Sequence, residues 1–167
     1  KFDSSIGVLR EMWDRAGERT TAMENLTRTY IQTGRADEAA AFLDQILESE
    51  KTNLRANLLR GAVHAFVGEM EEAEARYRKV IEDHPERENG YGALANLLTR
   101  LGRLDEANDV IRQGIENAED TVGLLLARAA RLEREGAFED AILIYEQLYD
   151  ADKLSDVLAN NLASLLA

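Results

Sequence analysis

The sequence contains the hexapeptide GRADEA at residues 34–39, and related hexapeptides return as GEMEEA at 68–73, GRLDEA at 102–107 and GAFEDA at 136–141. Each begins with glycine, places an apolar side chain two residues later, and ends in an acidic residue followed by alanine. Chance does not set four glycines and four alanines in one register. A fixed period of about 20–50 residues predicts a repeat architecture: a solenoid, a propeller or an array.

Apolar residues at helical spacing lie on both sides of these glycines, which predicts a pair of helices in every period. In the third period these positions are Leu94, Leu97, Leu98 and Leu101 before the glycine, and Ala107, Val110, Ile111 and Ile115 after it. The glycine suits the left-handed residue that often ends a helix. The acids that follow favour the positive N-terminus of a second helix. The small alanine is expected where the two helices approach most closely.

Composition supports an all-α chain. Apolar residues make up 45% and charged residues 31% of the 167 positions, and there is one proline. That apolar content argues against a disordered chain, and the scarcity of proline removes the usual breaker of helices. The net charge of −12 disfavours nucleic acids and anionic membrane surfaces as partners. Cysteine is absent, so disulfides and thiolate metal sites are excluded, and no apolar run reaches the roughly 18 residues of a membrane span.

These residues resemble the tetratricopeptide repeat family. Its small residue in the first helix corresponds to Thr27, Gly61, Ala95 and Ala129, and its next large residue corresponds to Tyr30, His64, Leu98 and Leu132. Pro85 falls where the family places a proline before a new repeat. The resemblance covers the whole chain and implies a right-handed α-solenoid of antiparallel helix pairs. Asn57 departs from the pattern because it puts a polar side chain at a position that is usually large and apolar, and Arg60 and Arg128 stand where leucine is usual.

The register divides the chain into four full repeats and two half repeats. We expect repeats at 20–53, 54–87, 88–121 and 122–155. Residues 1–19 fit the second helix of a preceding repeat, and residues 156–167 fit the first helix of a following one. Because the chain ends in apolar Leu165, Leu166 and Ala167 rather than in a polar cap, we expect a longer array that continues in both directions.

Motifs for catalysis or cofactor binding are lacking, so we predict no enzyme, no cofactor and no metal. His64 stands at a packing position, and His84 lies in a linker, where we expect it to be solvated. The glycines around Tyr91 lack the preceding strand and further glycines of a dinucleotide loop. The acid-rich stretch 69–74 lacks the oxygen spacing of a calcium loop and is better read as a solvated helix start.

Charge is divided unevenly between the two helices of the repeats. The first-helix segments, with residues 156–167, carry +2 in total, and the second-helix segments with their linkers carry −14. In the family the first helices line the concave groove. The resemblance therefore places there the polar and apolar side chains of Asn25, Arg28, Arg55, Leu58, Phe66, Asn89, Asn96, Arg100, Leu126 and Arg134. Arginine and asparagine beside apolar residues suit an extended peptide or an amphipathic helix. The alternative is that the second helices are acidic for solubility and the groove is merely less so.

The leading hypothesis is a scaffold for protein–protein interaction that holds a peptide or helix of a partner in this groove. We expect that segment to be neutral or acidic, with apolar anchors. Chaperone-binding members clamp a terminal carboxylate with lysines, asparagines and an arginine. The corresponding positions here hold Glu24 with Arg28, Leu58 with Ala62, and Gly92 with Asn96, so the full clamp is absent and that partner is not expected. The alternative is a substrate-recruiting or regulatory domain of a larger enzyme or of an assembly protein of the envelope or of exopolysaccharide. The resemblance favours bacterial members, and both the cytoplasm and the periplasm remain open.

Overall fold

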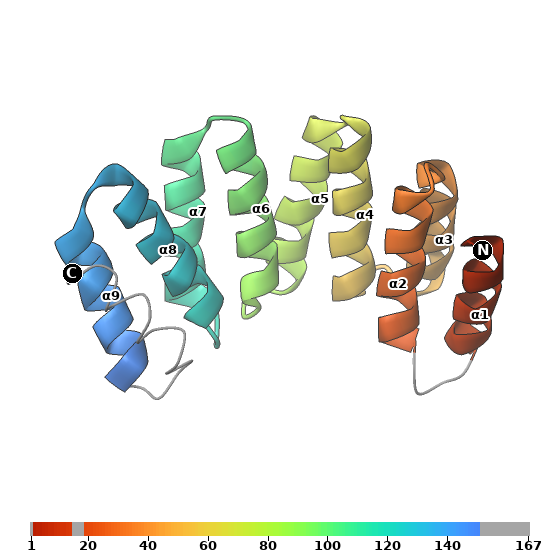
Figure 1. The fold of residues 1–167 in the computed structure, drawn as a ribbon, viewed down its shortest axis with the longest axis horizontal. Coiled ribbons are helices and arrows are strands. Elements are labelled where there is room, and N and C mark those ends of the chain that lie inside the picture. Colours follow the sequence, from red (N-terminus) through yellow and green to blue (C-terminus); the bar gives the residue numbers. More distant parts are fainter. Residues whose placement is uncertain (1, 15–18, 151–167) are drawn as a thin grey trace. The chain divides into compact units, whose positions relative to one another are not determined.

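A computed structural model describes residues 2–14 and 19–150, and in these ranges it contains nine α-helices and no strand (Figure 1). The helices are α1 (Phe2–Asp14), α2 (Arg19–Gln32), α3 (Ala36–Ser49), α4 (Leu54–Val67), α5 (Met70–Asp83), α6 (Glu88–Arg100), α7 (Leu104–Asn117), α8 (Val122–Glu135) and α9 (Phe138–Asp150). From α4 onward, successive first helices begin 34 residues apart, and so do the second helices from α3 onward. The predicted all-α solenoid of antiparallel helix pairs is confirmed.

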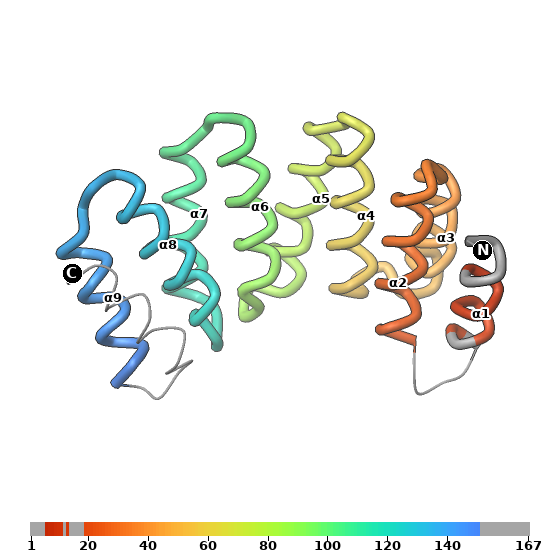
Figure 2. The backbone as a smooth tube through the Cα atoms, viewed as in Figure 1, coloured from red at the N-terminus to blue at the C-terminus, as the bar shows by residue number. Residues whose placement is uncertain are grey.

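The helices form two compact units, which are described separately. The first unit is residues 1–84 with α1 to α5, and the second is residues 85–167 with α6 to α9. In each unit the backbone turns back sharply after every first helix (Figure 2). The first unit has a core around Leu26, Tyr30 and Leu43, and the second has a core around Ala129, Ala141 and Tyr145. The predicted half repeat at 156–167 lies outside the described residues.

The repeated glycines end the first helices as predicted. Gly34, Gly68, Gly102 and Gly136 all have φ between +73° and +92°, in the left-handed region that a side chain disfavours. The residue after each glycine donates its backbone N–H to the carbonyl five residues earlier: Arg35 to Tyr30 over 2.8 Å and Arg103 to Leu98 over 2.9 Å. These bonds satisfy helix-terminal carbonyls and fix the reversal of the chain.

The repeated alanines lie where the paired helices meet. Ala39, Ala73 and Ala141 are completely buried, and Ala107 is 2% exposed. Close approach is also visible at Gly61, where an added Cβ would lie 2.5 Å from Cε1 of Tyr77. The small residues of the pattern are therefore explained by helix packing rather than by a ligand.

Two polar residues, Asn57 and His84, are held by hydrogen bonds, and Asn57 shows how a departure from the pattern is accommodated. The amide of Asn57 is buried, donates to the carbonyls of Lys51 and Asn53, and accepts from Arg76 over 3.0 Å. Its hydrogen bonds therefore replace the apolar contact expected at that position. His84 lies in the linker after α5 and is partly exposed, and its Nε2 is also 2.6 Å from the carbonyl oxygen of Thr52.

Candidate partner-binding pockets

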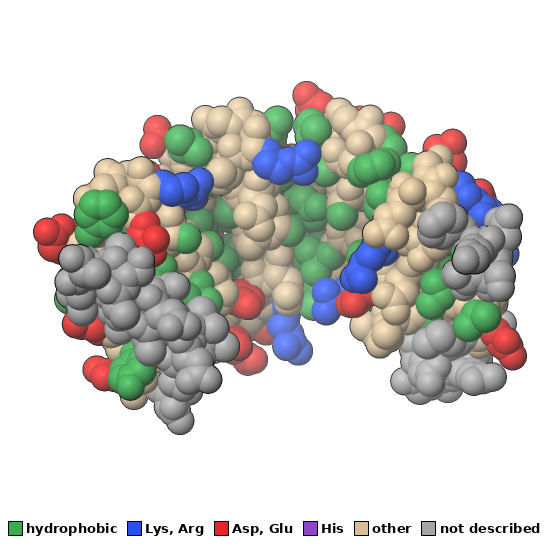
Figure 3. Space-filling view, in the orientation of Figure 1, with side chains coloured by type: hydrophobic (Ala, Val, Ile, Leu, Met, Phe, Trp, Pro, Cys, Tyr) green, Lys and Arg blue, Asp and Glu red, His purple; other side chains and the backbone are tan. Residues whose placement is uncertain are grey.

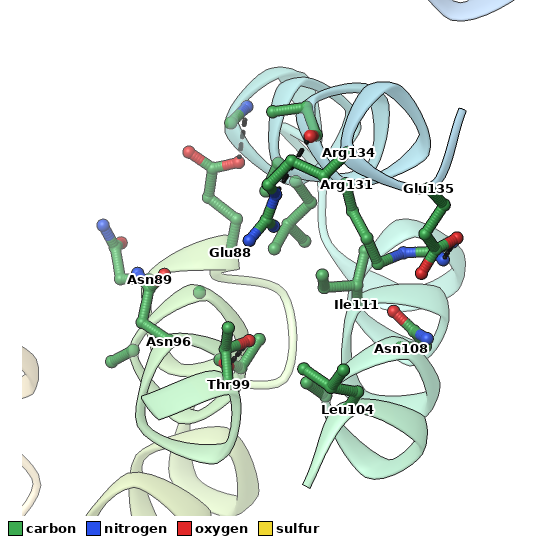
Figure 4. A pocket seen from close by; sticks show the side chains of 18 residues that line it. Glu88, Asn89, Asn96, Thr99, Leu104, Asn108, Ile111, Arg131, Arg134 and Glu135 are labelled. Atoms are coloured by element: carbon green, nitrogen blue, oxygen red, sulfur yellow. Dashed lines mark hydrogen bonds and ion pairs between the residues drawn. The ribbon is translucent and has the colours of Figure 1, made fainter. Parts of the chain in front are cut away.

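A cavity of about 720 Å³ lies in the second unit, between α6, α7 and α8. Figure 4 shows Asn89, Asn96 and Thr99 on α6 at one side and Leu104 on α7 at another. Arg134 projects from α8 above them. We call this cavity the second-unit pocket. Its volume is in the range of clefts that hold small ligands or a few side chains.

Small side chains keep this pocket open. The α6 and α8 walls contain Gly92, Ala93, Ala127 and Ala130, so neither helix fills the space between them. Buried leucines on the opposite sides of these helices hold them in the core; Leu94 and Leu98 on α6 are examples. Helical spacing therefore gives each first helix one packed face and one face that lines the pocket.

The floor of the pocket comes from α7 and is largely apolar. Leu104, Ala107 and Ile111 line it, and Ile111 is buried while Leu104 is 52% exposed at the rim. Behind the floor, Tyr91 packs against Gly114. Burial raises the pKa of Tyr91 because the phenolate would lose hydration, and a hydrogen bond with Asn117 opposes that shift. The phenol is therefore a neutral packing group here.

Several polar groups at the pocket have unused hydrogen-bonding capacity. The side chains of Asn89 and Asn96 are exposed and make no hydrogen bond with the described part of the chain. The Oδ1 acceptor of Asn108 is buried and receives no hydrogen bond from a described residue. The Nε donor of Arg131 is also buried and has no acceptor among the described residues. A buried polar atom without a partner costs about 1–3 kcal/mol, so a bound group that satisfies it would be favoured.

The charges of the pocket balance. Arg131 pairs with Glu135, and Glu88 accepts a hydrogen bond from the backbone N–H of Gly123 at the start of α8 over 3.1 Å. Arg134 donates to the carbonyl of Ala130 and has no ion pair with any described residue. In the space-filling view, hydrophobic side chains gather between α6 and α8 of this unit (Figure 3). A neutral, apolar segment with polar main-chain groups would match this lining.

A smaller pocket in the first unit lies between α2 and α4 and has a volume of about 490 Å³. It is lined by Glu24, Thr27, Arg28, Ile31 and Gln32 from α2, and by Arg55, Leu59 and Ala62 from α4. Nε of Arg55 lies 3.0 Å from Oε1 of Glu24. We call this cavity the first-unit pocket, and it contains two arginines against one glutamate.

The 34-residue period relates the linings of the two pockets. Arg28 and Ala62 in the first unit correspond to Asn96 and Ala130 in the second, and all four line a pocket. The same holds for Arg55 with Asn89 and Gly123, for Leu59 with Ala93 and Ala127, and for Gln32 with Arg134. Each pocket is therefore the same part of the repeat with different side chains.

Half of the ten residues predicted for the groove line a pocket. Asn89, Asn96 and Arg134 line the second-unit pocket, and Arg28 and Arg55 line the first-unit pocket. The other five, Asn25, Leu58, Phe66, Arg100 and Leu126, do not line either one. Leu126 is half-buried against the core of α8 and α9, whereas Phe66 is 57% exposed at the end of α4. Phe66 and Arg100 occupy the same position of the repeat as Gln32 and Arg134, which do line a pocket.

The contribution of α7 to the second-unit pocket was missed, because the groove was assigned to first helices alone. A signal was present in the sequence: Leu104, Ala107, Asn108 and Ile111 have the i, i+3, i+4, i+7 spacing of one helical stripe. Asn108 interrupts this otherwise apolar stripe with an amide. A polar residue within an apolar stripe of a second helix would have pointed to it.

A third cavity, of about 430 Å³, lies between α1 and α3 beside the edge-to-face rings of Trp13 and Phe42. Glu38 borders it, and a hydrogen bond from Arg35 lowers the pKa of its carboxyl. Among the described residues no group of three His, Cys, Asp or Glu side chains could hold a metal ion. None of the described helices is long and apolar enough to cross a membrane.

Comparisons of the sequence and of the structure with known proteins lead to the same family. The model of the tetratricopeptide repeat matches residues 1–63 and 67–130. A thermophilic tetratricopeptide repeat protein of Thermus thermophilus superposes with a TM-score of 0.70 at 19% identity, covering 99% of this chain and 90% of that one. A tetratricopeptide repeat protein of Parabacteroides merdae gives a TM-score of 0.68 at 20% identity, covering 99% of this chain and 65% of that one. At such identities these two structures bear on the fold alone.

A curated relative is the FK506-binding protein-like protein of Mus musculus, which is 32% identical over 90 residues. The match covers 54% of this chain and 26% of the mouse protein. The chain thus spans about a quarter of that relative. Similar proteins occur in a mammal as well as in bacteria, so the predicted bacterial source stays a prediction.

Proposed function

Since the chain belongs to the tetratricopeptide repeat family, we propose that it is a non-catalytic scaffold that holds a segment of a partner protein in the pockets beside its first helices. Repeats of this family bind proteins or peptides. The observation that carries the proposal is the second-unit pocket, a cavity of about 720 Å³ with an apolar floor. Amide groups without hydrogen-bond partners, such as Oδ1 of Asn108, border it. A segment with an apolar side chain would bury that side chain against Ile111, and its main chain would satisfy the amides.

Energetics favour a site in which the apolar floor supplies affinity and the amides hold the peptide backbone. Apolar burial yields about 25 cal/mol for each Å² removed from water, so an apolar anchor in the pocket supplies most of the affinity. The amides of Asn89 and Asn96 can both donate and accept, which matches the alternating groups of an extended peptide backbone. Such contacts hold a segment without demanding a particular sequence. The floor then selects by the size of the anchor.

A blocking variant tests the proposal. Ala127 is exposed on α8 and lines the pocket, so Ala127→Trp should fill the open space without disturbing the core. Gln113→Trp places the same side chain on an exposed part of α7 that does not line the pocket. Peptides selected from a displayed random library on the full chain are then titrated against both variants by fluorescence anisotropy.

We expect Ala127→Trp to weaken the selected peptides about tenfold or more, corresponding to about 1.4 kcal/mol or more of lost binding free energy. The control, Gln113→Trp, should bind as the unaltered chain does. Circular dichroism should show both variants folded. If the selected peptides bind Ala127→Trp with unchanged affinity, the second-unit pocket is not the binding site.

A further inference from the structure

The first-unit pocket differs from its counterpart in charge. Of its charged side chains, Arg28 and Arg55 are cationic and Glu24 is anionic, so the lining carries +1 within a chain of net charge −12. The corresponding charges in the second-unit pocket balance. A positive site on a strongly negative molecule is a local feature that the general charge does not explain.

We propose that the first-unit pocket binds the carboxylate of an acidic side chain, Glu or Asp, in the partner segment. This inference rests on the proposed function, because it assumes that a partner segment lies beside the first helices. It adds a specific chemical preference to one pocket. The occupant is an acidic residue flanked by apolar ones.

Arg28 supplies the first reason. Its side chain is exposed, lines the pocket, and makes no ion pair or hydrogen bond with any residue that the structure describes. The planar guanidinium of arginine presents paired N–H donors that match the two oxygens of a carboxylate. An incoming carboxylate therefore gains a partner at Arg28 without breaking an existing contact.

Arg55 supplies the second reason. Its one ion pair, with Glu24, joins side chains that are 47% and 32% exposed. Exposed pairs of this kind contribute about 0–1 kcal/mol. Arg55 can therefore share its donors with a bound carboxylate, while Glu24 competes for the same donors. This competition predicts that loss of the Glu24 charge strengthens binding.

Thr27 and the apolar lining supply the third reason. Thr27 lines the pocket and is 1% exposed, and its hydroxyl has no hydrogen-bond partner among the described residues. Because this oxygen is itself buried, the Thr27 side chain must rotate before the hydroxyl can donate to a carboxylate oxygen. Beside it, Ile31 and Leu59 offer apolar contact for the methylene groups of the acidic residue or for its neighbours.

The test compares two probes on the full chain. One is a capped heptapeptide with two glutamates among leucine and alanine residues, and the other carries glutamine in place of each glutamate. Binding is followed by NMR through the side-chain Nε–H signals of the arginines. We expect the glutamate peptide to bind about fivefold more tightly, within the range of charge-assisted contacts that remain partly hydrated, and to shift the signals of Arg28 and Arg55.

Matched variants separate the local site from net charge. Arg28→Gln should reduce the preference for glutamate strongly, leaving only the share that Arg55 contributes. Arg78→Gln changes the net charge equally at an exposed residue of α5 and should preserve the preference. Glu24→Gln should raise the preference about twofold to threefold, since the competing exposed pair is weak. Glu82→Gln is its control, because Glu82 is 73% exposed on α5.

Equal binding of the two peptides, or a preference that Arg28→Gln leaves unchanged, would overturn the proposed acidic preference of this pocket. A loss of preference in Glu24→Gln would overturn it too. These failures are distinguishable from failure of the proposed function. If the proposed function itself is wrong, neither peptide perturbs the NMR signals of the second-unit pocket, such as those of the side-chain amide of Asn96.

Discussion

Replacing Gly114 by alanine should destabilise the second unit, whereas the same replacement at Gly92 should stabilise it. Both glycines lie inside helices, Gly114 in α7 and Gly92 in α6. Alanine in a helix gains about 0.5–1 kcal/mol over glycine, because less backbone entropy is lost on folding. The difference between the two sites must therefore come from what the added methyl group meets.

At Gly114 the added Cβ would lie 2.5 Å from Cδ1 of Leu124 and 2.9 Å from Cβ of Tyr91. Carbon atoms pack at about 3.5–4.0 Å, so both contacts are too short. The Leu124 methyl can rotate away, but Cβ of Tyr91 moves only with the backbone of α6. Such overpacking costs about 1–3 kcal/mol. At Gly92 the nearest contact is 4.0 Å from Cδ2 of Leu124, an ordinary distance.

Because the helix-propensity gain is common to both variants, the difference in their free energies of unfolding should be about 1–3 kcal/mol. Urea denaturation followed by circular dichroism measures this difference on the full chain. Equal changes in the two variants, or a stabilised Gly114→Ala, would refute the close packing of α6 and α7 behind the pocket.

Three further predictions address packing, charge and pH. Ala107→Leu should destabilise by about 1–3 kcal/mol in urea denaturation, while exposed Glu116→Leu should change stability by less than about 0.5 kcal/mol. Arg28→Glu in the first-unit pocket should weaken binding of acidic peptides in anisotropy titrations, most at low salt, and Asp105→Lys on α7 should affect it little. The pKa of Glu38 is lowered by its arginine partner, so the stability this carboxylate contributes is lost as pH falls below its ordinary value of 4.5. In acid titrations followed by circular dichroism, Glu38→Gln should remove that component.

The period could be predicted from the sequence because glycine and alanine at its fixed points have strict physical requirements. Gly102 needs a positive φ, and Ala107 lies at a helix contact where larger side chains do not fit. The pockets were harder to predict. The family register assigned Asn96 and Arg134 to the lined face, but it contains no information on which second-helix residues close the floor. Ile111 and Asn108 do so because α7 passes behind α6 and α8, which depends on three-dimensional packing.

Contacts that hold the fold and side chains that line the pockets occupy different positions of the repeat. Leu26 and Leu94 stand two periods apart, and both are completely buried. Two positions further along, Arg28 and Asn96 are likewise two periods apart, and both are exposed in a pocket. Asparagine in place of arginine at the position of Arg28 would change the first-unit pocket from cationic to neutral without changing a core residue. Substitutions of exposed residues usually alter stability by less than about 0.5 kcal/mol, so each pocket can acquire its own preference independently. Under the proposed function, one fold would thus allow the first-unit pocket to bind an acidic residue and the second-unit pocket to bind an apolar anchor.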